Sequence, residues 1–169
     1  MRVHKGFTLI EIIVVLALLG VVAASALATI DPFGQLQKSN DAHRKADLES
    51  VQHALELYYQ DKGGYPTSSA DFQIMNGPIT VSWGSSWSPY MTTLPKDPSL
   101  SNRYVYYSPP SASGQAYYLY ANLQRGAKDK QSCNNGNACP SIGSAAGFPT
   151  GNACGGVCNY GVSSSNVAP

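Results

Sequence analysis

This sequence carries little charge. Only 12% of its 169 residues are charged, and the formal net charge is +1. The eleven Lys and Arg residues are scattered, and their densest group is the pair Arg44 and Lys45. Because binding to nucleic-acid phosphates needs clustered basic side chains, we expect no nucleic-acid partner.

Catalytic motifs are also missing. The sequence contains no GxSxG, no HExxH and no phosphate-binding loop. Its three histidines, His4, His43 and His53, lie far along the chain from the four cysteines. A metal site at His43 or His53 would need further ligands that converge on them, so we expect both to be solvated or to lie at an interface. These absences predict that the protein is not an enzyme.

What the sequence does have is a long apolar run near its N-terminus. Residues 7–30 are strongly apolar and carry one formal charge, Glu11. A helix of about 20 apolar residues can cross a bilayer, and an acid inside such a span is costly, which points to a function. The basic residues Arg2 and Lys5 precede the run, so the positive-inside rule places the C-terminal part outside the cytoplasm.

Two general interpretations of this run remain open. An ordinary secretory signal peptide would have small-residue cleavage patterns like those at residues 24–26 and 26–28. The length of the run and the carboxylate of Glu11 argue against it. A plain membrane anchor is the second interpretation, and it would leave Glu11 without a role.

A third interpretation comes from residues 5–11, KGFTLIE. They resemble the cleavage and methylation motif of type IV prepilins and type II secretion pseudopilins. The resemblance implies that a prepilin peptidase removes residues 1–6 by cutting between Gly6 and Phe7, and that Phe7 is then N-methylated. It also implies that Glu11 pairs with the methylated amine of a neighbouring subunit and sets the register of assembly. A buried charge needs such a cationic partner.

The apolar segment, residues 7–32, is expected to serve as a transmembrane and filament-core helix, and residues 33–62 as its amphipathic continuation. Pro32 and Gly34 interrupt the helical pattern. Either one helix ends there and another begins, or one long helix is kinked, as the resemblance implies. We expect the kinked continuous helix.

Two sets of side chains in residues 33–62 follow helical spacing. One set predicts an apolar stripe facing a core: Leu48, Val51, Leu55 and Tyr58. The other predicts a solvated face: Asp41, Lys45 and Glu49. Gly63 and Pro66 should end the helix.

Residues 63–130 are expected to form a globular head. Runs rich in aromatic and apolar residues predict strands at residues 103–107 and 116–121, and a short run predicts a further strand at residues 80–83. Residues 109–114 would form the hairpin loop. The predicted fold class is α+β: a long N-terminal helix packed on a small antiparallel sheet, followed by a loop-rich C-terminal region with four cysteines.

Residues 131–169 carry no charge, are rich in Gly, Ser and Asn, and contain Cys133, Cys139, Cys154 and Cys158. An exported segment with an even number of cysteines favours disulfides, while a zinc site and free thiols are the alternatives. Four cysteines allow three pairings, which the sequence does not decide. Short loops containing Gly make local pairing feasible, and we favour it.

The resemblance extends to residues 94–98, LPKDP, which are similar to a segment of type II secretion major pseudopilins. It also implies a calcium site in an acidic C-terminal loop, but this chain has no Asp or Glu after Asp129. Asp97 and Asp129 could still contribute ligands, yet we expect no cofactor.

The resemblance implies a structural subunit of a type IV filament in the inner membrane, with its head outside the cytoplasm. Its expected partners are copies of itself, minor pilins, the prepilin peptidase and an inner-membrane assembly platform. The LPKDP segment favours a secretion pseudopilus, whereas the cysteine-bearing tail favours a pilus. The alternative function is a membrane-anchored binding module that does not polymerise.

Overall fold

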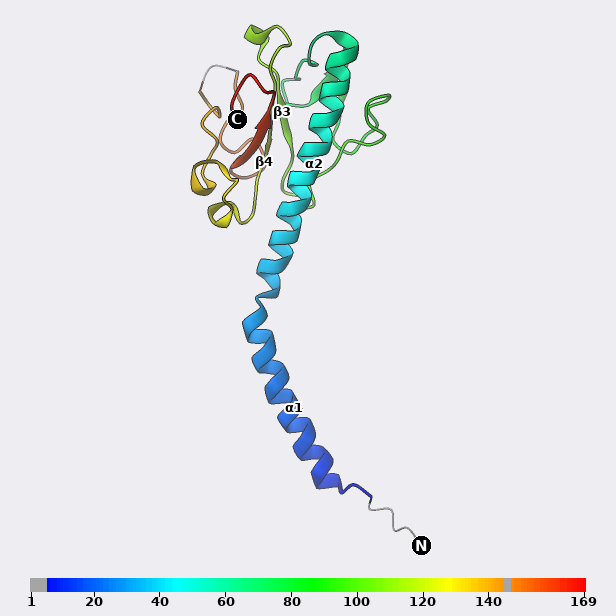
Figure 1. Cartoon of the computed structure of the whole chain (residues 1–169), viewed down its shortest axis with the longest axis vertical. Coiled ribbons are helices and arrows are strands. Elements are labelled where there is room, and N and C mark those ends of the chain that lie inside the picture. The colour runs from blue at the N-terminus through cyan, green and yellow to red at the C-terminus, as the bar shows by residue number, and fades with distance from the viewer. Residues whose placement is uncertain (1–5, 145–146) are drawn as a thin grey trace. The chain divides into compact units, whose positions relative to one another are not determined.

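The structure is a computed structural model that describes residues 6–144 and 147–169 (Figure 1). The chain forms two compact units, one ending at Leu36 and the other running from Gln37 to Pro169. Expectations for the basic leader, which include Arg2, His4 and Lys5, lie outside the described residues.

The N-terminal unit contains helix α1, Leu9–Ile30, and the start of helix α2, Pro32–Lys62. A single residue, Asp31, separates them and has left-handed backbone angles, φ 44° and ψ 69°. Its carboxylate accepts a hydrogen bond from the backbone N–H of Gly34 (3.0 Å), and its carbonyl accepts one from that of Gln35 (3.1 Å). Asp31 therefore caps α2 at its N-terminus.

The expectation of one kinked continuous helix is corrected here, because a helix ends and a new one begins. Pro32 is the first residue of α2. Proline has no N–H to donate and a φ angle suited to a helix, so it is well tolerated at this position. Gly34 lies in the same first turn. The interruption falls where Pro32 and Gly34 predicted it, and the residue that leaves the helix is Asp31.

The larger unit, the head, begins within α2. Three residues of the predicted stripe, Leu48, Val51 and Leu55, are fully buried, and Tyr58 is half-buried against the same core. His43 and His53 are exposed, as predicted. Helix α2 thus supplies one wall of the head's core.

The main sheet of the head has three antiparallel strands in the order β3-β4-β5. Their bounds are Val105–Tyr107, Tyr118–Ala121 and Tyr160–Ser163. In the register, Tyr106 faces Leu119, and Leu119 faces Val162. A separate hairpin pairs β1, Ile74–Asn76, with β2, Ile79–Val81. The strands predicted near residues 103–107 and 116–121 are confirmed, whereas β5 lies in the region expected to be rich in loops, where no strand was predicted.

Both faces of the main sheet are buried. On one face, Tyr106 and Leu119 pack with the apolar stripe of α2. On the other, alternating side chains of the same strands, such as Tyr107 and Tyr118, pack with C-terminal residues that include Cys154. Figure 1 shows α2 on one side of the strands and the orange C-terminal segment on the other. The C-terminal region is therefore part of the head's core.

A buried ionic cluster joins three segments of the head. The guanidinium of Arg44, which is 0% exposed, donates to both oxygens of Asp97 (2.8 Å each) and to Asp41 Oδ1 (2.8 Å). Asp41 also accepts hydrogen bonds from the backbone N–H groups of Gln124 and Arg125 (2.8 Å each). Burial alone would lower the pKa of Arg44, but its bonds to the two carboxylates outweigh burial and raise that pKa.

The predicted solvated face is wrong in part. Asp41 is buried, and Lys45 is half-buried with its ammonium group bound to Asp129 and Gln131. Only Glu49 is exposed as expected. Helical spacing placed these residues on one face correctly, but it carries no information about which loops pack against that face.

We predict that Arg44→Met lowers the free energy of unfolding by about 3–5 kcal/mol, because it leaves the carboxylates of Asp97 and Asp41 buried without their cation. Urea denaturation of the full chain in neutral detergent, followed by near-UV circular dichroism, measures this. The matched control is Lys38→Met, at an exposed site on the same helix, which should cost at most about 0.5 kcal/mol. Equal costs for the two variants would show that the cluster does not stabilise the head.

Candidate functional site

The predicted processing site lies ahead of α1. Gly6 and Phe7 belong to no helix or strand, and the Phe7 side chain is 79% exposed. The bond between Gly6 and Phe7 therefore lies outside the helix and beside an exposed side chain.

Helix α1 begins with a capping box formed by Thr8 and Glu11. The backbone N–H of Glu11 donates to Thr8 Oγ1 (3.3 Å), and the backbone N–H of Thr8 donates to Glu11 Oε2 (3.5 Å). Each side chain thus satisfies a backbone donor that the first helical turn leaves unpaired. This role of Thr8 was not predicted from the sequence, although the spacing T-x-x-E is the signature of a capping box.

The capping box holds the Glu11 carboxylate at the N-terminal end of α1, the same end as Phe7. Its bond to the Thr8 N–H is long, so the carboxylate keeps most of its capacity to accept further hydrogen bonds. The helix dipole also favours a negative charge at this position. The geometry suits an ion pair between Glu11 and a cationic amine brought close to this end of the helix.

The rest of α1 offers an almost wholly apolar surface. Every residue from Phe7 to Ala26 is exposed, and the segment Leu9–Ala26 has a mean hydropathy of 2.7. Within the described residues it is the one helix long and apolar enough to cross a membrane. Such a surface requires lipid or other apolar helices around it.

The four cysteines form two local disulfides. Cys133 is bonded to Cys139 and Cys154 to Cys158, which is the pairing favoured from the sequence. This excludes free thiols and a thiolate zinc site. All but Cys133 are buried against the outer face of the sheet, so the disulfides belong to the packing of the head.

The two carboxylates considered as calcium ligands are already bound to cations. Both oxygens of Asp97 accept from Arg44, and Asp97 also accepts from the backbone N–H of Ser99 (2.8 Å). Asp129 accepts from Lys45 Nζ (2.5 Å) and from the N–H of Gln131 (2.9 Å). Burial opposes ionisation of Asp129, but these bonds outweigh it and lower its pKa.

No group of three or more His, Cys, Asp or Glu side chains is placed to hold a metal ion in residues 6–144 and 147–169. Calcium needs six to eight oxygen ligands, usually including free carboxylates. The described side chains of this head therefore supply no such group of carboxylates.

Comparison with known proteins now decides the family. The family described as type II secretion system (T2SS), protein G matches residues 32–138, and the prokaryotic N-terminal methylation motif matches residues 1–27. The chain belongs to the type II secretion system protein G family. Its N-terminus carries the methylation motif on which the resemblance rested, and the match to the family leaves out residues 139–169.

The relatives agree with this assignment. A type II secretion system core protein G of Vibrio cholerae is 31% identical over 111 residues, which are 64% of this chain and 74% of the relative. That of Pseudomonas aeruginosa is 28% identical over 134 residues, or 76% and 91% of the two chains. The fimbrial protein EcpC of Eikenella corrodens is 36% identical over 69 residues, which are 41% of this chain and 44% of that protein. No solved structure matches.

We predict that calcium does not stabilise this head. Saturating a native-state site at 100 times its dissociation constant would add about 2.7 kcal/mol, which raises the melting temperature of a domain this size by roughly 5 °C or more. We expect the melting temperatures in calcium and in excess chelator to agree within about 2 °C. A rise of more than about 5 °C with calcium but not with magnesium would contradict the loss of the site.

Proposed function

We propose that this chain is a structural subunit of a type II secretion pseudopilus, anchored in the inner membrane before it polymerises through α1. The observation that carries the proposal is an apolar helix in which no residue from Leu9 to Ala26 is buried in the described chain, and which bears one carboxylate, Glu11, in its first turn. The membership in the protein G family supports the choice of a secretion pseudopilus over a pilus.

The apolar surface of α1 needs a cover both before and after assembly. In the membrane, hydrocarbon covers its apolar side chains; after assembly, the helices of other copies cover them. Small residues such as Ala17, Gly20 and Ala24 let such helices approach closely. An ionised Glu11 is costly in either apolar environment. The N-methylated amine of Phe7 on a neighbouring copy would supply its counter-ion, so the subunits are stable together only in the register that brings the two groups into contact.

Processing would prepare this pair. A prepilin peptidase that cuts between Gly6 and Phe7 removes the basic leader, creates the amine at Phe7, and leaves α1 in place. The further partners we propose are minor pilins and an inner-membrane assembly platform, by virtue of the family. The role is structural and not catalytic. A membrane-anchored module that does not polymerise would share the anchor but would not need Glu11.

We predict that the mature protein lacks residues 1–6 and carries one added methyl group at Phe7. Intact-mass measurement of protein purified from membranes checks this. The control is Gly6→Leu, which should block cleavage because a branched side chain replaces the residue at the cut, and should leave the full-length mass. A mature N-terminus at Thr29 would instead indicate an ordinary signal peptidase and would refute this processing.

We predict that Glu11→Gln abolishes filaments while leaving a processed, membrane-held and folded subunit. Glutamine keeps the shape and can still complete the capping box, so the variant removes only the charge. Electron microscopy of cells that overproduce the subunit measures filaments, and near-UV circular dichroism checks the head. Asp71→Asn, an exposed charge change in a head loop, is the control and should keep filaments. Normal filaments with Glu11→Gln would exclude the register role.

A further inference from the structure

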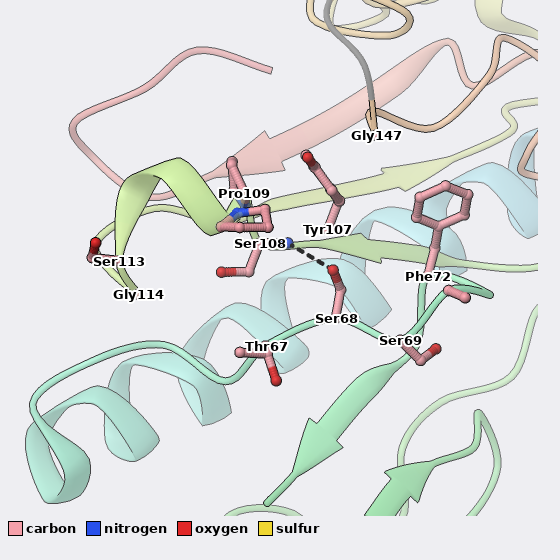
Figure 2. A pocket seen from close by; sticks show the side chains of 12 residues that line it. Thr67, Ser68, Ser69, Phe72, Tyr107, Ser108, Pro109, Ser113, Gly114 and Gly147 are labelled. Atoms are coloured by element: carbon pink, nitrogen blue, oxygen red, sulfur yellow. Dashed lines mark hydrogen bonds between the residues drawn. The ribbon is translucent and has the colours of Figure 1, made fainter. Parts of the chain in front are cut away.

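The head contains a cavity that the proposed filament role does not use. It has a volume of about 690 Å³ and opens between residues 67–72 and the turn after β3 (Figure 2). Cavities of roughly 300–1,000 Å³ are the usual size of small-molecule sites. The size therefore admits a ligand of several linked rings.

The lining of the cavity is uncharged and rich in hydroxyl groups. Six of its residues carry a hydroxyl: Thr67, Ser68, Ser69, Tyr107, Ser108 and Ser113. Among the described residues, the hydroxyls of Thr67, Tyr107 and Ser113 have no hydrogen-bond partner in the protein. Each hydroxyl can both donate and accept. The cavity thus presents polar groups of the kind that fix the orientation of a neutral polar ligand.

An aromatic ring lies at one end of the same cavity. Phe72 is half-buried, and its ring is 6.1 Å from that of Tyr107. Its backbone has φ 58°, which an aromatic residue rarely adopts. Hydrogen bonds hold it there: the N–H of Phe72 donates to Ser69, and its carbonyl accepts from the N–H of Tyr106. Unfavoured backbone angles of this kind gather at ligand sites, and this one turns a flat apolar surface toward the cavity.

The surroundings disfavour an extended peptide as the ligand. Peptides that add a strand to a sheet need unpaired backbone donors at its edge. Here the N–H of Tyr106 already donates to the Phe72 carbonyl (2.8 Å), and that of Ser108 donates to Ser68 Oγ (3.3 Å), which Figure 2 marks with a dashed line. The edge beside the cavity is therefore occupied.

An ionic ligand is disfavoured as well. No Lys, Arg, His, Asp or Glu lines the cavity as described. A phosphate or carboxylate would find no counter-charge, and burying it unpaired would be costly. The one charge close by in sequence is Asp71, which is exposed and negative, so it would repel anions further.

We propose that this cavity binds a neutral oligosaccharide. The hydroxyl groups of such a ligand would exchange hydrogen bonds with Thr67, Ser113 and Tyr107, and the apolar face of a sugar ring would pack on Phe72. This binding uses only residues of the head and does not depend on polymerisation, so the proposal stands or falls separately from the filament role.

The first experiment uses the full chain, labelled and kept in a detergent without a sugar headgroup. It is applied to an array of immobilised neutral oligosaccharides built of glucose, galactose, mannose or N-acetylglucosamine, beside matched uronic-acid and sialylated chains. We expect binding to neutral members and none above background to the acidic ones. Calorimetric titration with the strongest neutral oligosaccharide then gives the affinity in solution.

Variants of the lining residues test the site itself. Phe72→Gly removes the ring and suits the positive φ, so we expect at least a tenfold loss of affinity without unfolding. Thr67→Val and Tyr107→Phe each remove one hydroxyl at nearly constant shape, and we expect threefold or greater losses. The matched controls lie outside the cavity: Thr93→Val on an exposed loop and Tyr118→Phe on β4 should keep the affinity within twofold.

Three outcomes would overturn the proposal. The first is no binding to any neutral oligosaccharide on the array. The second is binding that the lining variants and their controls change equally, with melting temperatures that show all variants folded. The third is displacement by a proline-rich peptide that itself binds with higher affinity, because the cavity would then be a peptide site.

Discussion

The sheet formed by β3, β4 and β5 is buried on both faces, and the rest of the head is arranged to cover it. A strand with successive tyrosines, such as β3, presents large rings alternately to both sides. Leaving either set in water would forgo most of the stabilisation that burial of such rings provides. Helix α2 covers one face, and the disulfide-bonded C-terminal region covers the other. Residues 131–169 therefore have a structural role. Their sequence does not indicate this role, because it has neither charge nor a regular hydrophobic pattern.

The buried cluster around Arg44 connects the parts that cover the sheet. Its two carboxylates come from α2 and from the loop that contains Asp97, and the backbone beyond β4 binds Asp41. An ionic group without solvent is stable only when every partner is present, so the cluster makes the positions of these three segments depend on one another. Lys45 and Asp129 repeat the arrangement one residue along α2. Both acids that might have served a metal ion serve this packing instead.

The N-terminal unit differs from the head in how its apolar residues are packed. Its helix α1 joins no core within the described residues, and a capping box between Thr8 and Glu11 lies at its N-terminal end. That pair starts the helix and keeps the carboxylate at the same end as Phe7. The head has its own core, whereas the residues of α1 from Leu9 to Ala26 are exposed in the described chain. In the function we propose, lipid and other copies of the chain cover that apolar surface.

Several features could be predicted because they are local. The processing motif, the apolar run, the stripe of Leu48, Val51 and Leu55, and two strands follow from spacing along one element. The role of Asp31 as the N-cap of α2 was not predicted, although Asp is a favoured N-cap residue. The interruption of the helix was attributed to Pro32 and Gly34. Burial of Asp41 and the existence of β5 were missed for another reason. Both depend on segments some 40 to 80 residues away, such as the backbone at Gln124, and helical or strand spacing does not report on these.

The sequence by itself determined the apolar run, its acid and the N-terminal methylation motif, because each depends on a short run of residues whose chemistry does not need a fold. It also favoured disulfides between the cysteines. Only the tertiary structure decided that these disulfides belong to the core, that Asp97 and Asp129 pair with Arg44 and Lys45, and that six hydroxyls and an aromatic ring line one cavity. The physical reason is that burial and charge pairing are properties of what packs against a residue, and in this head those neighbours come from distant parts of the chain.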